Sequence, residues 1–86
     1  MNILIYFVKK LNPQQGGTER VASNIAFALR ERGHNVYCTH KIEDEEDYGF
    51  ESFLMPSKEG NCKQNIDFIS NLISRLNIDI IINESG

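Results

Sequence analysis

Apolar residues gather in four short segments that have the length and composition of β-strands. The first, Asn2–Val8, is a nearly continuous run of β-branched and aromatic residues, which is typical of a strand buried on both faces of a parallel sheet. The other three segments are Asn35–Thr39, Ser52–Met55 and Ile78–Asn83. The high Ile content of the last one favours a central position in such a sheet.

A helix is predicted between the first two strands, from Thr18 to Arg32. Gly16-Gly17 breaks the preceding pattern, Thr18 is the expected N-cap, and Glu19 favours the first turn through the helix dipole. Gly33 is expected to end the helix in a left-handed conformation. The apolar positions recur at helical spacing and predict the buried stripe: Val21, Ala22, Ile25, Ala28 and Leu29.

A second helix is predicted from Asn61, which would cap it, with Gln64 in the position of a capping-box partner. Its expected buried stripe has the helical period and consists of Cys62, Ile66, Ile69, Ile73 and Leu76. The alternation of strands and helices predicts an α/β fold, a Rossmann-like parallel sheet flanked by helices, with a right-handed β-α-β crossover.

Composition narrows the class of protein. The chain has 86 residues, 41% hydrophobic and 24% charged, with a formal net charge of −3. These values are typical of one small folded unit, and the chain lacks the basic stripe that nucleic-acid binding needs. The apolar run at the start is too short to span a bilayer and has no basic flank, so we expect a cytoplasmic protein. Cys38 and Cys62 are expected to be free thiols.

The acidic run Glu43–Asp47 is expected to form a solvated loop in preference to a metal site, because a hard-cation loop spaces its ligands around an internal Gly turn. His34 and His40 flank the second strand, and neither has a Ser, Cys or carboxylate at the spacing of a triad or a metal site. Both are expected to be surface or strand-end residues, and no metal ligand is predicted.

The segment Gly16-Gly17-Thr18 is the strongest candidate for chemistry. It lies between a buried strand and a helix N-terminus, where free backbone N–H groups favour an anion and glycine lets a ligand approach closely. The alternative is a simple turn into the helix. Glu19 and Arg20 could reach a ligand there or form a solvated first turn. The segment matches neither the dinucleotide fingerprint G-x-G-x-x-G nor a P-loop.

The stretch Met1–Thr39 resembles the opening of family-four glycosyltransferases. Its first strand reads Asn-Ile-Leu-Ile-Tyr, residues 16–20 read Gly-Gly-Thr-Glu-Arg and are followed by Val-Ala, and residues 29–36 read Leu-Arg-Glu-Arg-Gly-His-Asn-Val. The glycine doublet with Glu19-Arg20, and a helix that ends at Gly33-His34, occur together in that family. From Lys41 onward the resemblance rests on the order of elements and on Ile78–Asn83, which is similar to the family's fourth strand.

The resemblance implies a GT-B architecture, in which two Rossmann-like domains face each other across a cleft. The N-terminal domain holds the acceptor and the C-terminal domain holds the nucleotide-sugar. Residues 1–86 would be the first part of the N-terminal domain, without the donor-binding domain, so we expect the chain alone to be inactive. Gly16, Gly17 and Thr18 would face the donor diphosphate, with Glu19 and Arg20 as further ligand contacts.

The family's paired glutamates, and a histidine that follows a later strand of its N-terminal domain, are absent here, so no catalytic residue is assigned. The resemblance implies a retaining enzyme without a metal cofactor, whose donor is a nucleotide-diphosphate sugar. It also implies a glycan or lipid-linked acceptor, in bacterial polysaccharide synthesis, with peripheral association of the full enzyme at the inner face of the membrane.

A sheet that stops after its fourth strand would expose an edge, which favours self-association of such a fragment. The alternative function is a stand-alone Rossmann-like module that binds a partner protein without catalysis. The reading frame downstream of Gly86 would discriminate the two, because a second α/β domain with paired glutamates supports the enzyme and a stop codon supports the module.

Overall fold

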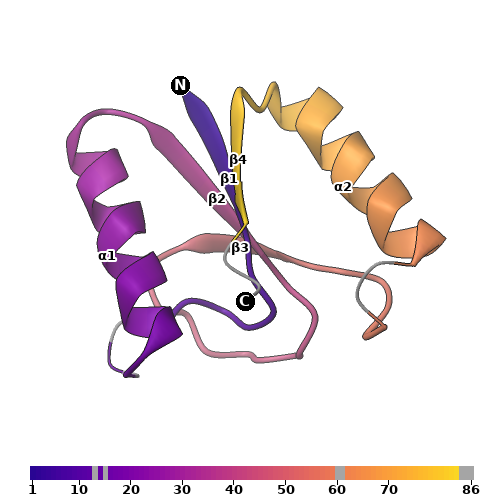
Figure 1. The fold of residues 1–86 in the computed structure, drawn as a ribbon, viewed down its shortest axis with the longest axis horizontal. Helices are drawn as coiled ribbons and strands as arrows, with labels where there is room; N and C mark the ends of the chain where they lie inside the picture. Colours follow the sequence, from indigo (N-terminus) through magenta and orange to yellow (C-terminus); the bar gives the residue numbers. More distant parts are fainter. Residues whose placement is uncertain (13, 15, 60–61, 84–86) are drawn as a thin grey trace.

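The computed structural model of the protein describes residues 1–12, 14, 16–59 and 62–83. The predicted strands and helices all form, with ends that differ by one or two residues from those expected. Figure 1 shows them in chain order: β1 (Asn2–Tyr6), α1 (Thr18–Glu31), β2 (Asn35–His40), β3 (Glu51–Leu54), α2 (Lys63–Leu76) and β4 (Ile80–Asn83).

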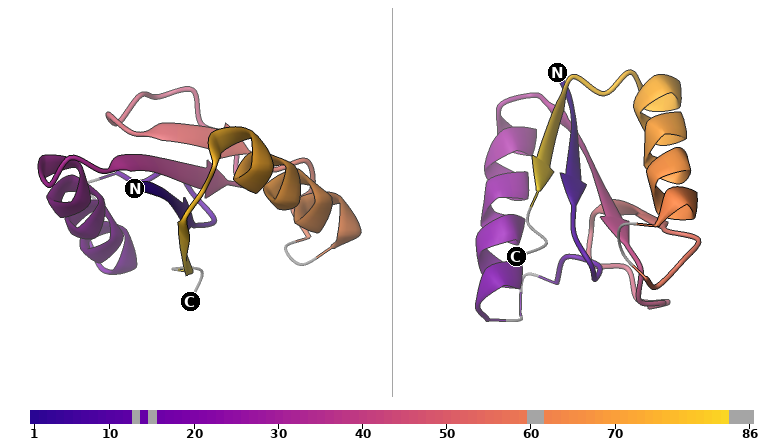
Figure 2. Two further views of the ribbon diagram at one scale, coloured as in Figure 1. Left: turned by 90° about the horizontal axis from the view of Figure 1, so that it is seen from above. Right: turned by 45° about the vertical axis from the view of Figure 1, so that its right-hand side comes forward.

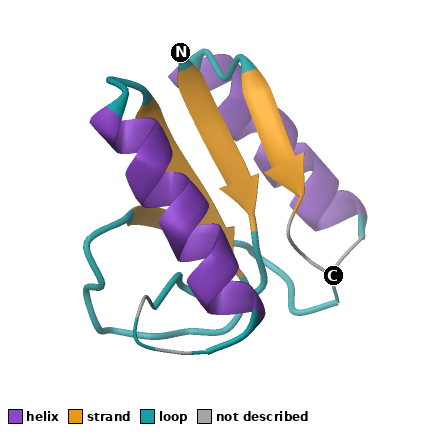
Figure 3. Ribbon diagram, turned by 60° about the vertical axis from the view of Figure 1, so that its left-hand side comes forward, coloured by secondary structure: helices purple, strands orange, loops and turns teal. Residues whose placement is uncertain are grey.

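The strands form one parallel sheet in the order β3-β2-β1-β4. In β1, Ile3 lies opposite Val36 of β2 on one side and opposite Ile80 of β4 on the other. Helices α1 and α2 lie on opposite faces of this sheet, as Figure 2 and Figure 3 show from different sides. The α/β class and the Rossmann-like arrangement are therefore confirmed.

Strand β1 is central and buried, whereas β4 is at an edge of the described sheet. Leu4 and Ile5 of β1 are fully buried, but Ile80 and Ile81 of β4 are 42% and 46% exposed. The prediction of a central position for the Ile-rich segment was wrong. Ile enrichment reports a preference for the extended backbone, and it does not determine how many neighbours a strand acquires.

The parallel neighbours β2 and β3 are joined by the irregular segment 41–50, with no helix between them. Parallel pairs usually need a longer crossover that contains a helix. The acidic run Glu43–Asp47 lies in this connection, and Glu43 and residues 45–47 are exposed. The prediction of a solvated loop is confirmed.

The N-cap of α1 is Gly17, so the prediction of Thr18 was wrong by one residue. An N-cap has non-helical dihedral angles, and Gly17 has φ 67° and ψ −136°, so that Thr18 is already helical. At the other end Gly33 has φ 89°, which confirms the left-handed conformation expected there. In α2 the N-cap is Cys62 and the left-handed C-cap is Asn77, whereas Asn61 lies outside the described residues.

The buried stripe of helix α1 matches the prediction in part, because Ala22 is buried and Leu29 packs against the core as expected. Ala22, Ser23 and Ala26 are fully buried, and the two alanines pack in a core with residues of β1 and β2, while Val21 is 55% exposed and Ala28 is also exposed. Small side chains let the helix approach the sheet closely. A prediction based on hydrophobic residues alone does not place a serine such as Ser23 on the buried face.

Helix α2 is also rotated relative to the prediction. Leu72 and Asn65 are buried, and Ile66 is 56% exposed. Asn65 is tolerated inside because its side chain exchanges two hydrogen bonds with the backbone of Ser57, at 2.9 and 2.8 Å. A polar residue with backbone partners therefore replaces an isoleucine on the inner face.

At the amino edge of the sheet, the side chain of Asn2 links β1 to its neighbours. Its Nδ2 donates to the carbonyl oxygens of Leu76 and Asn77 at the end of α2, at 2.8 and 3.2 Å, and its Oδ1 accepts from Asn35 Nδ2 at 2.9 Å. Its backbone N–H donates to Asp79 Oδ2 at 2.8 Å. One asparagine thus connects β1, β2 and the turn from α2 to β4.

Within the described residues, neither helix combines the length and the apolar character that crossing a bilayer requires.

Candidate functional site

The order of the strands points to the carboxyl edge of the sheet as the place for a ligand. From β1 the chain continues to β2 and β3 on one side, and β4 lies on the other side of β1. In open parallel sheets, ligands bind outside the carboxyl ends of the strands, where the strand order reverses in this way. The loop that follows β1, including Gly16-Gly17, leaves the sheet at this point and leads to the start of α1 (Figure 1).

The geometry of Gly17 requires glycine. Its φ of 67° with ψ −136° belongs to a region that other residues rarely adopt. Both Gly16 and Gly17 are exposed, and an added Cβ on either would have no described atom within 4 Å apart from those of the adjacent residues. The space beside both glycines is therefore open to a ligand.

The start of α1 has N–H groups available for such a ligand. The N–H of Val21 donates to the carbonyl of Gly17 at 3.3 Å, which is the usual first helical bond. No side chain caps the preceding N–H groups within the described part of the chain. The side chain of Thr18 lies outside the described structure.

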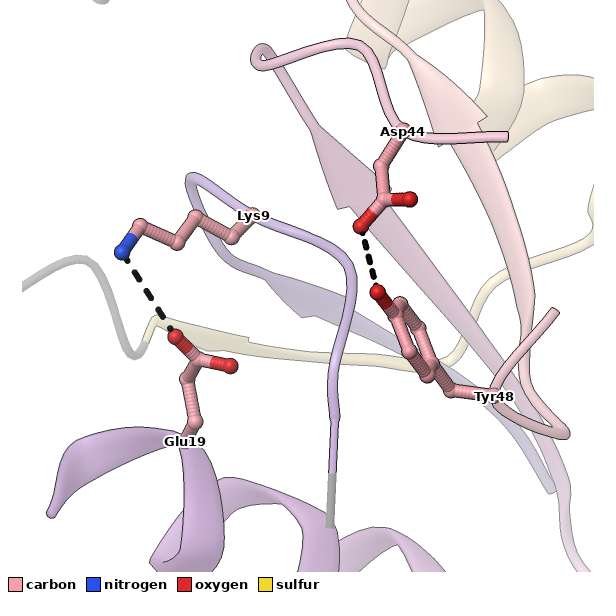
Figure 4. A network of polar contacts seen from close by, with 4 residues as sticks. All are labelled: Lys9, Glu19, Asp44 and Tyr48. Atoms are coloured by element: carbon pink, nitrogen blue, oxygen red, sulfur yellow. Dashed lines mark hydrogen bonds and ion pairs between the residues drawn. The ribbon is translucent and has the colours of Figure 1, made fainter. Parts of the chain in front are cut away.

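Glu19 and Arg20 differ in their surroundings. Glu19 has a side chain only 14% exposed and forms an ion pair with Lys9 at 3.7 Å, which Figure 4 shows. Arg20 is exposed and does not line the clefts described below. The structure thus brings Glu19 to a polar cleft and leaves Arg20 at the surface beside it.

This polar cleft has a volume of about 180 Å³. The loop after β1 contributes Lys9, Lys10 and Asn12 to its wall, and α1 contributes Glu19. The opposite wall comes from residues 42–44 and 48 of the loop after β2. Two loops that follow neighbouring parallel strands therefore form one site, as expected where carboxyl ends of strands lie side by side.

Asp44 and Tyr48 form the polar centre of the wall from the loop after β2. The Tyr48 hydroxyl donates to Asp44 Oδ2 at 2.7 Å (Figure 4). Asp44 Oδ1 accepts a second hydrogen bond from the N–H of Glu46 at 3.0 Å. The bond from Tyr48, followed by that from Glu46, lowers the pKa of Asp44. The same bond to Asp44 raises the pKa of Tyr48. Asp44 therefore stays ionised and Tyr48 stays protonated at neutral pH.

A second depression, of about 330 Å³, adjoins this cleft and shares Asn12 and Tyr48 with it. Gln14 and Asp47 complete its lining. Together the two hollows have the volume of an ordinary ligand site, for which ~300–1,000 Å³ is usual. We call the two hollows together the loop groove.

His40 was predicted to be a surface or strand-end residue, and the strand-end position is confirmed. His40 ends β2, but it is only 5% exposed, and its Nδ1 is hydrogen-bonded to Ser52 Oγ of β3 at 2.6 Å. Burial, and then the charge of Lys10, lowers its pKa, while Asp44 acts in the opposite direction. The partner was missed because it is a neighbour in the sheet, twelve residues away in the chain.

His34 lies at the amino edge, where its Nδ1 is 3.1 Å from the N-terminal ammonium group, and it does not line the loop groove. Both cysteines are free, as predicted, with Cys38 buried and Cys62 partly exposed. In the described part of the chain no three His, Cys, Asp or Glu side chains gather as metal ligands would.

Several groove residues were not singled out from the sequence, namely Lys9, Lys10, Asn12, Asp44 and Tyr48. Their position directly after the first and second strands was a usable signal, because the carboxyl ends of parallel strands meet at one edge. Their contacts with one another depend on the path of two irregular loops, which no local pattern encodes.

Comparison of the chain with models of protein families, with curated proteins and with solved structures returns no match.

Proposed function

We propose that this chain is the acceptor-side part of a retaining glycosyltransferase of the GT-B type, which transfers a sugar from a nucleotide-diphosphate sugar to a glycan or lipid-linked acceptor. The observation that carries the proposal is Gly17. This residue combines a positive φ, open space beside it and the N-cap position of α1, at the carboxyl edge of a parallel sheet. A helix start without a side-chain cap among the described residues, with a glycine as its N-cap, suits a diphosphate, because the helix dipole and free N–H groups attract anions.

In this proposal the amides of the Gly16-Gly17-Thr18 segment stabilise the negative charge that develops on the donor diphosphate as it leaves. Preorganised donors of this kind are worth about 2.7 to 4 kcal/mol in the transition state. Glu19 contributes less directly, because it is paired with Lys9 and forms the wall between the glycine loop and the loop groove. Arg20 is exposed next to the loop and is available to a ligand that arrives from outside the sheet.

The loop groove supports the acceptor half of the proposal. A hollow with hydroxyl, amide, carboxylate and ammonium groups, adjoining the first turn of α1, offers the donors and acceptors that a polyhydroxylated ligand needs. The donor would be held mostly by a second Rossmann-like domain, as the resemblance of Met1–Thr39 to family-four enzymes implies. The enzyme would work in the cytoplasm, at the inner face of the membrane, in bacterial polysaccharide synthesis.

The test compares the 86-residue chain with the protein extended by the reading frame downstream of Gly86. The extended protein should release nucleoside diphosphate and glycosylate an acceptor with one member of a panel of nucleotide-diphosphate sugars. The 86-residue chain should show no transfer and should bind these donors no better than about millimolar. Micromolar donor binding by the short chain would overturn the domain assignment.

The role of the glycines is tested in the extended protein with Gly16→Ala and Gly17→Ala. If their amides face the diphosphate, an added methyl group crowds it, and kcat should fall on the order of a hundredfold. Near-normal kcat in both folded variants would remove the diphosphate role from this loop and leave it a turn into α1.

A stand-alone module that binds a partner protein is the second candidate, and one observation favours it. Ile80 and Ile81 of β4 are about half exposed at an edge of the described sheet, and exposed edges pair readily with other chains. A stop codon directly after Gly86, together with no transfer activity, would support this candidate over the enzyme.

A further inference from the structure

The inference concerns the kind of acceptor that the loop groove binds, and it rests on the proposed function. The first relevant feature of the groove is its shape. The two hollows, of about 180 and 330 Å³, are distinct but share Asn12 and Tyr48 in their walls. A ligand that fills both must pass Tyr48, so one sugar ring on each side of this residue fits the groove better than a single ring.

Tyr48 is held in place for such a contact. Its hydroxyl is bound to Asp44 Oδ2 at 2.7 Å, and Asp44 is itself fixed by the N–H of Glu46 at 3.0 Å. The phenol ring therefore loses little freedom when a ligand binds. Aromatic rings offer a flat apolar face, which suits the C–H face of a pyranose, while the neighbouring amide and carboxylate groups take its hydroxyls.

The second feature of the groove is its charge. The described lining residues carry four carboxylates, of Glu19, Glu43, Asp44 and Asp47, and two ammonium groups, so their net charge is −2.

Both ammonium groups already have partners. Lys9 is paired with Glu19 at 3.7 Å, and Lys10 Nζ donates to the carbonyl of Glu46 at 2.8 Å. A phosphate or uronate group would thus meet excess negative charge from the described lining residues, where each lysine already makes one contact. An amino group would meet the opposite situation.

We propose that the loop groove binds a carbohydrate chain of at least two rings that carries amino groups and no negative charge, with Tyr48 as the platform between two ring positions. The chemical class of the acceptor is therefore an amino-sugar oligosaccharide. Neutral chains of the same length fit the shape but lack the favourable charge, and acidic chains are disfavoured by the negative charge of the groove.

The test is an NMR titration of the isotope-labelled 86-residue chain with three β-1,4-linked disaccharides, one of glucosamine, one of glucose and one of glucuronic acid. We expect the amide signals of Asn12, Asp44 and Tyr48 to shift most with the glucosamine disaccharide. The glucose disaccharide should bind more weakly, and the acidic one at least about tenfold more weakly than the first, with a dependence on ionic strength.

Variants separate the ring from the charge. Tyr48→Ala should lose at least about tenfold in affinity, whereas Tyr48→Phe keeps the ring and should retain most of it. Glu43→Gln should reduce the preference for the amino sugar without abolishing binding. Tyr37→Phe, a matched change outside the lining of the groove, should change nothing.

Equal or tighter binding of the acidic disaccharide, undiminished binding by Tyr48→Ala, or no shift in the groove with the glucosamine disaccharide would each overturn the proposal. The titration contains no nucleotide donor. A failure here therefore concerns the acceptor groove alone, and it is distinguishable from a failure of the extended protein to transfer sugar.

Discussion

Replacing Gly17 by alanine tests the geometry on which the candidate site depends. Gly17 has φ 67° and ψ −136°, and a residue with a Cβ is strained there by about 1 to 3 kcal/mol. The added methyl group itself meets no described atom within 4 Å, so no steric overlap contributes. For a chain of this size, 1 kcal/mol corresponds to roughly 4 to 8 °C in Tm, and Gly17→Ala should lower Tm by at least about 4 °C.

Gly16→Ala is the matched control. Gly16 is the adjacent residue, its space is equally open, and its φ is not positive. This variant should stay within about 0.5 kcal/mol of the parent chain. The assay is urea and thermal unfolding of the 86-residue chain followed by circular dichroism. Equal stability of the two variants would refute the reasoning, because the conformation of Gly17 would then not be required by the fold.

Three further predictions follow from contacts elsewhere in the fold. Asn2→Ala should destabilise the chain by about 1 to 3 kcal/mol in urea unfolding, because three hydrogen bonds of the Asn2 side chain at the amino edge are lost. Asn35→Ala removes only one of these three bonds and should have a smaller effect. The folded-state pKa of His40 lies below its unfolded value of 6.5, so the unfolded chain binds the extra proton and the free energy of unfolding should fall as the pH drops through and below that value. A flat pH dependence in the parent chain, or an unchanged pH dependence in His40→Gln, would contradict this. A thiol reagent at neutral pH should modify Cys62 quickly, because hydrogen bonds from the backbone of Asn65 and from Ser57 lower its pKa. Burial raises the pKa of Cys38 to about 12 and should protect this thiol until urea unfolds the chain, so two fast thiols in the native chain would count against the buried position of Cys38.

The positions and types of all six elements were predictable because they depend on local patterns. The run Asn2–Tyr6 has no polar interruption and no helical period, which indicates a strand. Gly33 marks the end of the first helix, because its left-handed conformation stops the helix before it. The class of the fold then followed from the alternation of these elements. The glycine loop was also located from the sequence, since its breakers stand between a strand and a helix.

The faces of the helices and the neighbours of the strands were decided only by packing. Ile66 is exposed while Asn65 is buried, because the loop at Ser57 supplies Asn65 with hydrogen bonds that no pattern within the helix reveals. Similarly, Ile81 belongs to β4, which is an edge strand of the described sheet although its Ile-rich composition suits a central strand.

The candidate site shows the same division. Gly16 and Gly17 were recognised from the sequence as helix and strand breakers, and at Gly17 the need for glycine is a property of the local backbone. The groove beside them was not, because it exists only where the loop after β1 meets the loop after β2. The bonds that hold it, from Tyr48 to Asp44 and from Lys10 to Glu46, depend on the folded path of irregular segments. Local propensity thus determined the elements and the glycine turn, whereas contacts between residues distant in the chain determined which side chains form a site.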